Sequence, residues 1–433
     1  MTLYVKGGPI WIEPITYVKD GTVWKKAKEV WINDNGTWKL MSSSSTPPPI
    51  EDINFGTTYL WGDLEVNDSG GRIEGYVTPY QITSYTDCVK IQAYRNNTIY
   101  VLKNDGTIWA KGPNSNYQLG DGTTIDRTNF VLVGNGENDW ADFTITAGGT
   151  VALKNDGTLW GWGTNWGYRF GNGEPTSTVY QTPTKLNNDS DWKYVQTNAS
   201  YAYAFIALKS DNSLWGWGPN NYGVLANGGT DTIDTATQIT TNVICASVSY
   251  KCLAVLKDDG TIWWAGTIQS DPTDIIAYNL TKINNDTDWI CAKASHAGLH
   301  AIKANGTLWY FGKNLSHTSG AGPTYDTQEI FLNPIQIGTD NDWYDLYGGL
   351  NTVGAKKIDG TLWSWGWDAC TSTGTNSGQQ YVTIPTKVGN YTDWGYVCFR
   401  YRVTTAIRNS SGLGSDGVDM NHKCAVMTIP SVS

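Results

Sequence analysis

The feature that most constrains this chain of 433 residues is a strand–turn–strand segment that recurs along it. It reads VALKNDGTLWGWG from Val151, ALKSDNSLWGWG from Ala207 and AIKANGTLWYFG from Ala301. A repeat period near 50 residues is typical of propeller blades, and stacked repeats build one continuous core. The turn residues form one column whose members lie 51, 55, 48, 46, 54 and 52 residues apart: Gly106, Gly157, Asn212, Gly260, Gly306, Gly360 and Gly412.

A tryptophan follows the turn by three residues in six repeats. Alternation along a strand places every second side chain on one face, so we expect these indoles to pack between neighbouring blades as structural residues. Two aromatics outside this regular pattern are Trp166 and Trp367, and for them an alternative interpretation stays open, a platform on which a carbohydrate stacks. The six regular residues are Trp109, Trp160, Trp215, Trp263, Trp309 and Trp363.

A second recurring element is Asp-Trp, which precedes a strand each time. We expect its Asp and neighbouring Asn to bond local backbone amides, and its Trp to begin the strand. The variants NNDSD and NNDTD faintly resemble a calcium loop but lack the glycine and the distal glutamate of an EF-hand, so no metal site is predicted. The tryptophans concerned are Trp140, Trp192, Trp289, Trp343 and Trp394.

Composition narrows the functional classes. The net charge of −10 repels phosphate, which disfavours nucleic acid as a partner. No apolar run approaches the roughly 18 residues of a spanning helix, so we expect no membrane insertion. The start, MTLYVKGGPIWIEP, lacks the apolar core of a secretion signal. Seven widely spaced cysteines without a C-x-x-C pair predict buried free thiols in a protein that folds in a reducing cytoplasm.

Catalytic chemistry finds little support in the sequence. The four histidines lie in no recognisable catalytic motif, and His300 fits a structural role before its strand. Carboxylates that recur at the turns are explained by the turns. A glycosidase pair of carboxylates stays open, because spatial separations are invisible in a sequence. The prediction is a protein that is not an enzyme, with no catalytic residues and no cofactor.

Taken together, the motifs resemble the propeller repeats of the regulator of chromosome condensation (RCC1) family. The resemblance covers about residues 56–412 and rests on the strand GTLWGWG from Gly157, the loop NYQLGDG from Asn116, the hairpin ALKNDG from Ala152 and the step NPIQI at Pro334. It implies an all-β, seven-bladed propeller. The last hairpin lacks a following Leu-Trp-Gly strand, so an N-terminal strand around Leu60 is expected to close the ring. No exchange-factor wedge and no basic loops are visible, so the family's activities are not carried across.

The chain outside the repeats divides into three further parts: a small β-rich module at 1–41, a Ser/Pro linker at 42–55 and an extension at 413–433 without assignment. The module carries a net charge of +2 and resembles short W-K-x-A-K modules of bacteriophage virion appendages. That resemblance implies docking on a particle; the alternative is an independent hairpin with no partner. The candidate docking residues are Trp24, Lys25, Lys26, Trp31 and Trp38.

The sequence therefore predicts a bacteriophage structural protein, assembled in the host cytoplasm and located in the virion. Its N-terminal module would dock on other virion proteins of a tail or capsid, and its propeller would bind a host surface protein, a glycan or neighbouring virion proteins. The particle would set its oligomeric state. The alternative is a cellular propeller that binds a protein or a glycan. Candidate surface-binding residues are Trp166, Tyr168, Tyr180, His317, Tyr325 and Trp367.

Overall fold

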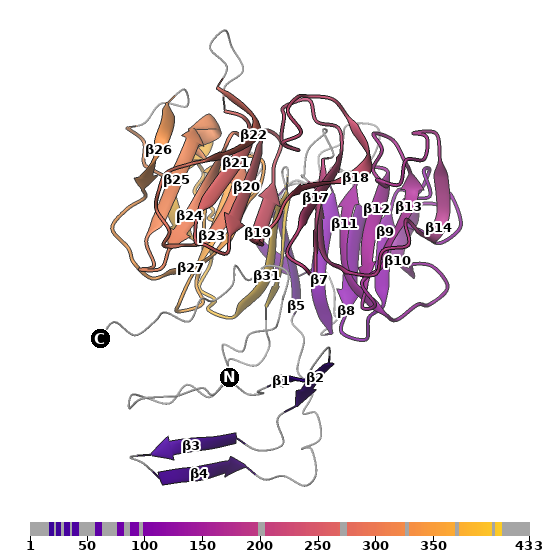
Figure 1. Ribbon diagram of the computed structural model, residues 1–433, viewed down its shortest axis with the longest axis horizontal. Helices are drawn as coiled ribbons and strands as arrows, with labels where there is room; N and C mark the ends of the chain where they lie inside the picture. The colour runs from indigo at the N-terminus through magenta and orange to yellow at the C-terminus, as the bar shows by residue number, and fades with distance from the viewer. Residues whose placement is uncertain are drawn as a thin grey trace.

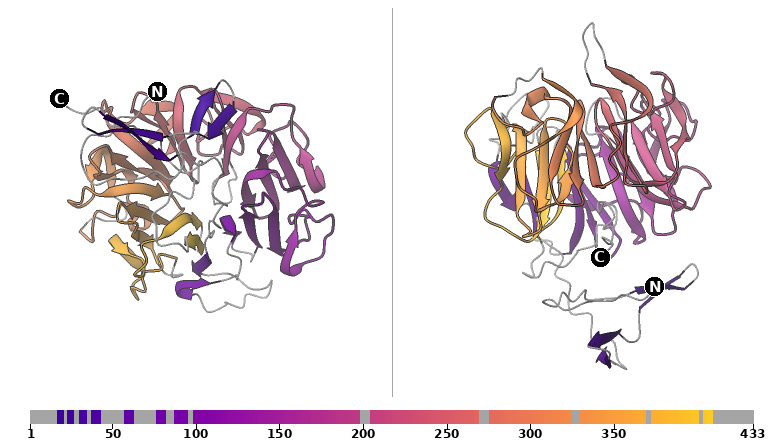
Figure 2. Two further views of the ribbon diagram at one scale, coloured as in Figure 1. Left: turned by 90° about the horizontal axis from the view of Figure 1, so that it is seen from below. Right: turned by 60° about the vertical axis from the view of Figure 1, so that its left-hand side comes forward.

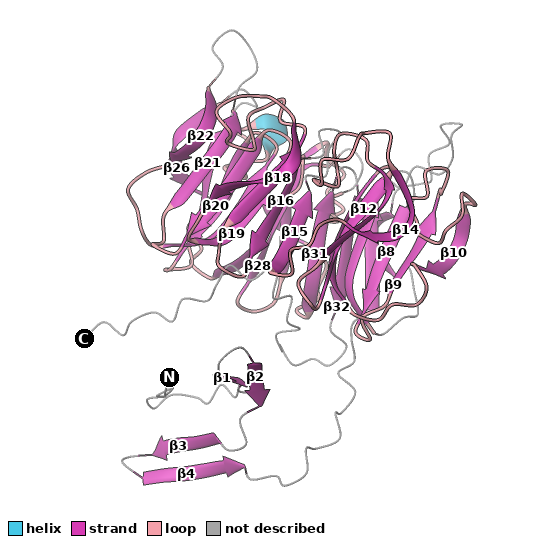
Figure 3. Cartoon of the chain, turned by 45° about the vertical axis from the view of Figure 1, so that its right-hand side comes forward, coloured by secondary structure: helices cyan, strands magenta, loops and turns pink. Residues whose placement is uncertain are grey.

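The computed structural model is built almost entirely of β-strands (Figures 1 and 3). Within the described residues, the only helix is the single 3-10 turn η1 (Leu315–His317), and no helix is long and apolar enough to cross a membrane. The structure describes residues 17–20, 23–26, 30–34, 37–42, 57–62, 76–81, 87–94, 98–197, 204–268, 275–324, 329–368, 372–400 and 403–408.

Six antiparallel sheets in the described part each contain four consecutive strands, and these are blades arranged around a central axis (Figure 2). The first strands are β7 (Cys88–Tyr94), β11 (Trp140–Thr146), β15 (Trp192–Thr197), β19 (Val243–Val248), β23 (Trp289–Ser295) and β27 (Trp343–Tyr347). The second strands are β8 (Thr98–Lys103), β12 (Gly149–Lys154), β16 (Phe205–Lys209), β20 (Cys252–Lys257), β24 (Gly298–Lys303) and β28 (Thr352–Lys357).

The third strand of each blade carries the recurring tryptophan, and the fourth lies at the outer edge. The third strands are β9 (Ile108–Gly112), β13 (Leu159–Thr164), β17 (Leu214–Gly218), β21 (Ile262–Thr267), β25 (Leu308–Lys313) and β29 (Leu362–Trp367). The fourth strands are β10 (Arg127–Leu132), β14 (Val179–Lys185), β18 (Ile233–Thr240), β22 (Ile276–Lys282), β26 (Ile330–Gln336) and β30 (Tyr381–Lys387).

The expected seven-bladed propeller has to be corrected to six self-contained blades. The last counted hairpin supplies only β31 (Trp394–Arg400) and β32 (Val403–Arg408), and no third strand of its own follows in the described chain. These two strands form a composite closing sheet with β5 (Thr57–Gly62) and β6 (Tyr76–Gln81), in the order β31-β32-β5-β6. The sequence analysis counted this composite sheet as a seventh repeat, because its hairpin has the repeat pattern. The expected closing strand around Leu60 is present as β5, and a second N-terminal strand, β6, lies beside it.

The closing sheet is joined to the first two blades by polar contacts, and to the first of them by apolar packing as well. Arg400 on β31 donates from Nη2 to Gln92 Oε1 (2.8 Å) on β7, and from Nη1 to Ile145 O (2.9 Å) on β11. Thr405 on β32 donates to Ile91 O (3.0 Å). Buried Leu60 of β5 packs in one apolar cluster with Ile91 and other β7 and β8 residues. One arginine therefore connects three sheets across the seam.

The core consists of apolar clusters between neighbouring blades. Between the first two blades, for example, Tyr100 and Leu102 pack with Phe143, Ile145 and Trp162. The tryptophans that follow the turn by three residues are half-buried at the edges of such clusters, as Trp160 is. They do pack between blades as expected, but at the edge of the core and not in its centre. In three blades a deeply buried aromatic lies two residues further along, at Trp162, Trp217 and Trp365, and in two blades one lies one residue further along, at Trp264 and Tyr310.

The turn column has the backbone that the sequence predicts. Gly106, Gly157 and the equivalent glycines have φ between 73° and 80°, and Asn212 has φ 66°, a left-handed region that Gly and then Asn tolerate best. Space is a second constraint, since a Cβ added at Gly106 would lie 2.1 Å from Asn138 O. The seventh member of the column, Gly412, lies outside the described residues.

Each second strand of the six blades ends in a lysine, and four of these lysines lie in a repeated cage. Lys303 ends β24 with Nζ 4.7 Å from the ring centroid of Trp289 and 5.1 Å from that of Trp309. Its Nζ also lies 2.8 Å from Asp286 Oδ2 and 3.1 Å from Asp288 Oδ1. We call this arrangement the lysine cage. It occurs around Lys154, Lys209, Lys303 and Lys357, with one or two aspartates each.

The strand bounds confirm that the Asp-Trp tryptophan begins a strand. The first residues of β11, β15, β23, β27 and β31 are Trp140, Trp192, Trp289, Trp343 and Trp394. The cage corrects the expected role of the aspartates, which pair with the cage lysine. The neighbouring Asn does bond a local backbone amide as expected, since Asn187 Oδ1 accepts from Asp189 N (3.1 Å) and Asn284 Oδ1 accepts from Asp286 N (3.1 Å). The carboxylates of NNDSD and NNDTD are likewise paired with Lys209 and Lys303.

The two N-terminal hairpins are separate two-stranded sheets, β1 (Tyr17–Asp20) with β2 (Val23–Lys26) and β3 (Val30–Asp34) with β4 (Thr37–Ser42). The candidate docking residues fall on these strands, with Trp24, Lys25 and Lys26 on β2, Trp31 on β3 and Trp38 on β4. Their side chains, the linker from residue 43 and the extension 413–433 lie outside the described part of the structure, so the docking prediction stays a prediction.

Closure by β5 gives a first testable consequence. We expect Leu60→Ala, at a side chain with no exposure, to lower the free energy of unfolding by about 2–5 kcal/mol, because it removes buried methyl groups at the seam. The matched control is Leu332→Ala, since Leu332 is 50% exposed, and its cost should stay within about 0.5 kcal/mol. Urea unfolding measures both. Equal costs would mean that β5 does not complete the closing sheet.

The lysine cage gives a second testable consequence. Lys303→Met keeps the apolar stem but removes two cation–π contacts and two ion pairs, whereas Lys257 lies over Trp263 alone and has no acid within ion-pair distance among the described residues. We expect Lys303→Met to lower the free energy of unfolding by about 1 kcal/mol or more beyond Lys257→Met, since one cation–π contact contributes about 0.5–2 kcal/mol. A smaller loss than in Lys257→Met would contradict a stabilising cage.

The ion-pair part of this difference should depend on pH. The hydrogen bond from Lys303 holds the pKa of Asp286 below its ordinary value. Its stabilising effect is therefore complete above the unfolded-state pKa, about 3.9, and is lost as the pH falls through the folded-state value. Urea unfolding repeated in acid should show the gap between Lys303→Met and Lys257→Met becoming narrower.

Candidate functional site

The blades present two unlike faces to solvent. Antiparallel order places the Asn-Asp-Gly turns and the Asp-Trp connections at one end of each blade, the turn face. The turns between first and second strands and the loops between third and fourth strands lie together at the opposite end, the loop face. The turn face repeats the lysine cage, whereas the loop face carries segments that differ in length and sequence. The search for a site therefore centres on the loop face.

A buried Asn or Asp one or two residues after the third strand anchors each of five loops. Its side-chain oxygen accepts a hydrogen bond from the backbone N–H five residues later. We call this contact the Asx clamp. The pairs are Asn114 with Leu119 (2.9 Å), Asn165 with Phe170 (2.9 Å), Asn220 with Leu225 (2.8 Å), Asn314 with Ser319 (3.0 Å) and Asp368 with Thr373 (3.0 Å).

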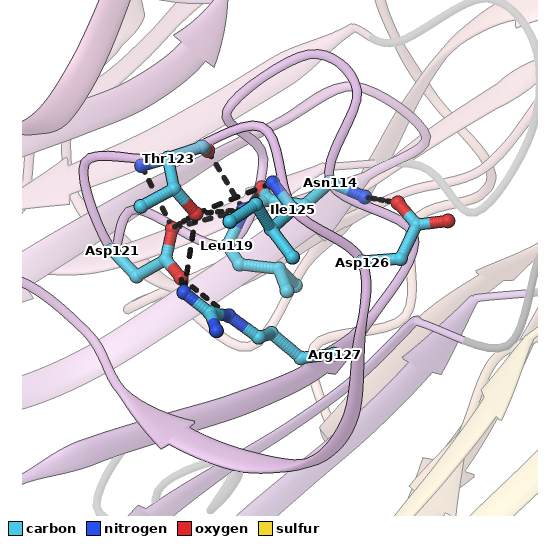
Figure 4. A network of polar contacts seen from close by, with 7 residues as sticks. All are labelled: Asn114, Leu119, Asp121, Thr123, Ile125, Asp126 and Arg127. Carbon is cyan, nitrogen blue, oxygen red and sulfur yellow. Dashed lines mark hydrogen bonds and ion pairs between the residues drawn. The ribbon is translucent and has the colours of Figure 1, made fainter.

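The first loop shows how far a clamp extends (Figure 4). Asn114 Nδ2 donates to Thr123 O (2.8 Å) and to Asp121 Oδ1 (2.9 Å), and Asp121 receives Arg127 Nε (2.8 Å). Burial opposes ionisation of Asp121, but hydrogen bonds from Thr123, Arg127 and Asn114 hold its pKa below the ordinary value. Asp126 Oδ1 accepts from Asn114 N (2.8 Å). The loop is a fixed frame, and Arg127 neutralises the carboxylate that a cation would need.

The second loop borders a pocket with an exposed tryptophan. Trp166 is 58% exposed and Val179 is 42% exposed, whereas Arg169 below them is only 1% exposed. Arg169 Nη1 donates to Thr164 Oγ1 (2.9 Å) and lies so close to Gly149 that a Cβ there would be 2.9 Å from it. The pocket has a volume of about 410 Å³ and is lined by Asn116, Ala147, Gly148, Thr164, Trp166, Arg169, Thr176, Ser177 and Val179.

The central channel is polar but narrow. Lys90 pairs with Asp142 there, and Lys293, Gln92 and Arg400 also line it. The cavity measures about 50 Å³, room for only a few waters when one ordered water needs about 10–15 Å³ on the same measure. The channel therefore serves the packing of the first strands. Sequence reasoning had no signal for it, because its side chains come from different sheets.

The other candidate surface residues are spread over several loops. Tyr168 is half-buried with φ 55°, and Tyr180 stacks on Phe170 with 4.8 Å between ring centroids. His317 packs edge-on against Tyr381 at 4.9 Å. Trp367 is half-buried and its carbonyl accepts from Thr352 Oγ1 (3.1 Å). Tyr325 lies outside the described residues. Of the candidates, the structure places Trp166 alone in the pocket, and it adds Arg169, Thr176 and Ser177, which sequence reasoning missed.

Burial shifts the pKa of several titratable side chains toward their neutral forms. Burial lowers the pKa of His296 to about 4 and that of His300 to about 3, and His300 Nε2 lies 2.8 Å from Thr318 O, which confirms its structural role. Burial raises the pKa of Cys88 to about 12. Cys88, Cys245, Cys252 and Cys291 are buried free thiols as predicted, and Cys398 is half-buried and free. Cys370 and Cys424 lie outside the described residues. Among the described side chains, no group of three His, Cys, Asp or Glu could hold a metal ion.

No family model matches the sequence. Among solved structures, human WBSCR16 is similar with 16% identity and a TM-score of 0.67, over 82% of this chain and 100% of that one. Prp20p from Saccharomyces cerevisiae is similar with 13% identity and a TM-score of 0.66, over 82% and 92%. Yeast RCC1 (Prp20) in its complex with Kap60 is similar with 13% identity and a TM-score of 0.66, over 86% of this chain and 96% of that one. The fold is that of an RCC1-type β-propeller.

The RCC1-type propeller confirms the resemblance drawn from the repeats, at the level of fold. The Prp20p structure is described together with binding to Gsp1p and histones, and those partners belong to that protein. At 13–16% identity the RCC1-type likeness carries no partner to this chain. Nothing in these similarities supports a phage appendage module.

The Asx clamp of the second loop can be tested directly. Asn165→Ala removes the donor to Glu174 O (2.7 Å) and the acceptor for Phe170 N, which leaves the amide of buried Phe170 without this partner. We expect a loss of about 1–3 kcal/mol in unfolding free energy and faster hydrogen exchange at the Phe170 amide. Asn165→Asp keeps the acceptor and should protect that amide, as Asp368 does in its own loop. Exposed Asn135→Ala is the control. Unchanged exchange in Asn165→Ala would show that the loop holds its shape without the clamp.

Proposed function

We propose that this protein is a binding protein whose RCC1-type propeller presents the loop face to a protein or a glycan. The observation that carries the proposal is the combination of a constant clamp with varied loops. The same side-chain contact fixes five loops, while the segments beyond each clamp differ. Binding residues are commonly placed on loops held by a rigid scaffold. The exposed Trp166 above its pocket is the clearest recognition feature on this face.

The distribution of charge favours a partner other than nucleic acid. The turn face contains many of the propeller's lysines, but their ammonium groups lie against tryptophan rings and aspartates in the lysine cages. A phosphate backbone needs lysines and arginines that are free to contact it. Together with the net charge of −10, this supports a neutral or protein ligand.

For the N-terminal segment we propose docking on a larger assembly, and a virion is the assembly that its sequence suggests. The support is the Trp- and Lys-rich sequence of residues 18–41 alone. Mass spectrometry of purified particles tests it. The chain should be present in them and should be lost after Trp24→Ala and Trp31→Ala together. Absence of the unaltered chain from particles would exclude the virion role and leave a cellular binding protein.

The loop-face proposal is tested with the fluorescently labelled full chain on glycan arrays and on cell envelopes. Ile125, which is 59% exposed in the loop between β9 and β10, is the second apolar side chain chosen on this face. We expect saturable binding that falls about 30-fold in the double variant Ile125→Ser/Trp166→Ala, since truncating a central anchor typically costs about 2 kcal/mol or more. The matched control is Ile358→Ser, because Ile358 is 70% exposed next to the turn Gly360 on the opposite face. Equal loss in both variants, or binding that only Ile358→Ser weakens, would place recognition elsewhere.

A further inference from the structure

The pocket beside Trp166 allows the ligand class to be named, and this inference rests on the proposed function of the loop face. Three features of the pocket converge: one exposed aromatic face, exposed hydroxyl and amide groups that bond no described residue, and a lining without any carboxylate.

The backbone on both sides of Trp166 is fixed in conformation. Trp166 follows the clamped Asn165, and Gly167 after it has φ 72° and faces Pro219. Its indole nevertheless leaves 58% of the residue exposed, next to exposed Val179. A large apolar surface that remains open to water in a concave site is typical of a ligand-binding site. A flat indole fits a ligand with one apolar face.

The polar groups around this face are neutral and available. Asn116, Thr176 and Ser177 are exposed, and their side chains make no hydrogen bond to any described residue. Amide and hydroxyl groups both donate and accept, which matches the hydroxyl groups of a sugar. They come from two neighbouring blades, with Asn116 in the loop of the first and the other two in the loop of the second.

The charge of the pocket restricts the ligand further. Arg169 is the single charged residue in the lining, and it is buried with Nη1 bonded to Thr164. The chain as a whole carries −10. An acidic ligand would meet a negatively charged protein without an exposed guanidinium to bind it. Neutral groups in the pocket and an excess of acid elsewhere therefore select a neutral ligand.

We propose that this pocket binds a neutral pyranose residue of a surface glycan. The C–H face of the sugar stacks on the Trp166 indole, and its hydroxyl groups bond the side chains of Asn116, Thr176 and Ser177. A pyranose combines one apolar face with a rim of neutral hydroxyls, which is the complement of this lining.

The test titrates the full chain with methyl glycosides of glucose, galactose, mannose and N-acetylglucosamine, read by saturation-transfer NMR and by tryptophan fluorescence. Methyl glucuronide serves as the acidic probe. We expect saturable binding of at least one neutral glycoside, with weaker binding of the glucuronide. Trp166→Ala should lower the affinity at least tenfold, and Trp166→Phe, which keeps an aromatic face, should lower it less.

Two controls keep the result specific. Ile358→Ala should bind as the unaltered chain does, and thermal unfolding should show that Trp166→Ala is folded, since its side chain is exposed. No saturable binding of any neutral glycoside, or equal affinity in Trp166→Ala, overturns the pyranose site. If envelope binding still depends on the loop face in that case, the proposed function stands and only this ligand assignment fails.

Discussion

The lysine cage is the contact on which the regularity of the propeller depends. In one cage Trp289 begins the first strand, Lys303 ends the second and Trp309 lies on the third, while Asp286 and Asp288 belong to the connection from the preceding blade. One ammonium group thus joins three strands of a blade to the chain that enters it. The two indoles meet edge to face at 89°, an arrangement that aromatic pairs prefer, and the cation lies near both rings. Where Val243 replaces the first tryptophan, the lysine lies over one ring only.

Much of this architecture was predictable because it is local. The left-handed turn residues at Gly157 and Asn212 follow from Asn-Asp-Gly chemistry, and the first residue of a strand follows from its Asp-Trp step. The sequence also contains a recurring pattern that indicates the lysine cage. A lysine stands three residues before the turn residue in six repeats, at Lys103, Lys154, Lys209, Lys257, Lys303 and Lys357. Its fixed position beside two recurring tryptophans and an aspartate indicates a cation between aromatic rings.

Closure was predicted in part, and the pocket could not be predicted. The missing third strand of the last hairpin predicted the closing strand around Leu60, and Leu60 does pair with Thr405, but no pattern in the sequence indicated that β6 joins the same sheet. Arg400, which joins three sheets, is the last residue of β31, and no other first strand of the described chain ends in an arginine. The pocket takes Asn116 from one blade and Thr176 and Ser177 from the next. A sequence could identify Trp166 as an unusual aromatic, but not the side chains that surround it.

The Asx clamp has a consequence for how such a protein can change over generations. Each clamp bonds a main-chain N–H of its loop, and the clamp of Asn165 also bonds the main-chain carbonyls of Glu174 and Pro175. Because these contacts do not depend on the loop's side chains, substitutions at positions such as Trp166, Thr176 and Ser177 leave the frame intact. Specificity can therefore drift one loop at a time while the ring keeps its fold, which makes the loop face an evolvable surface on an invariant support.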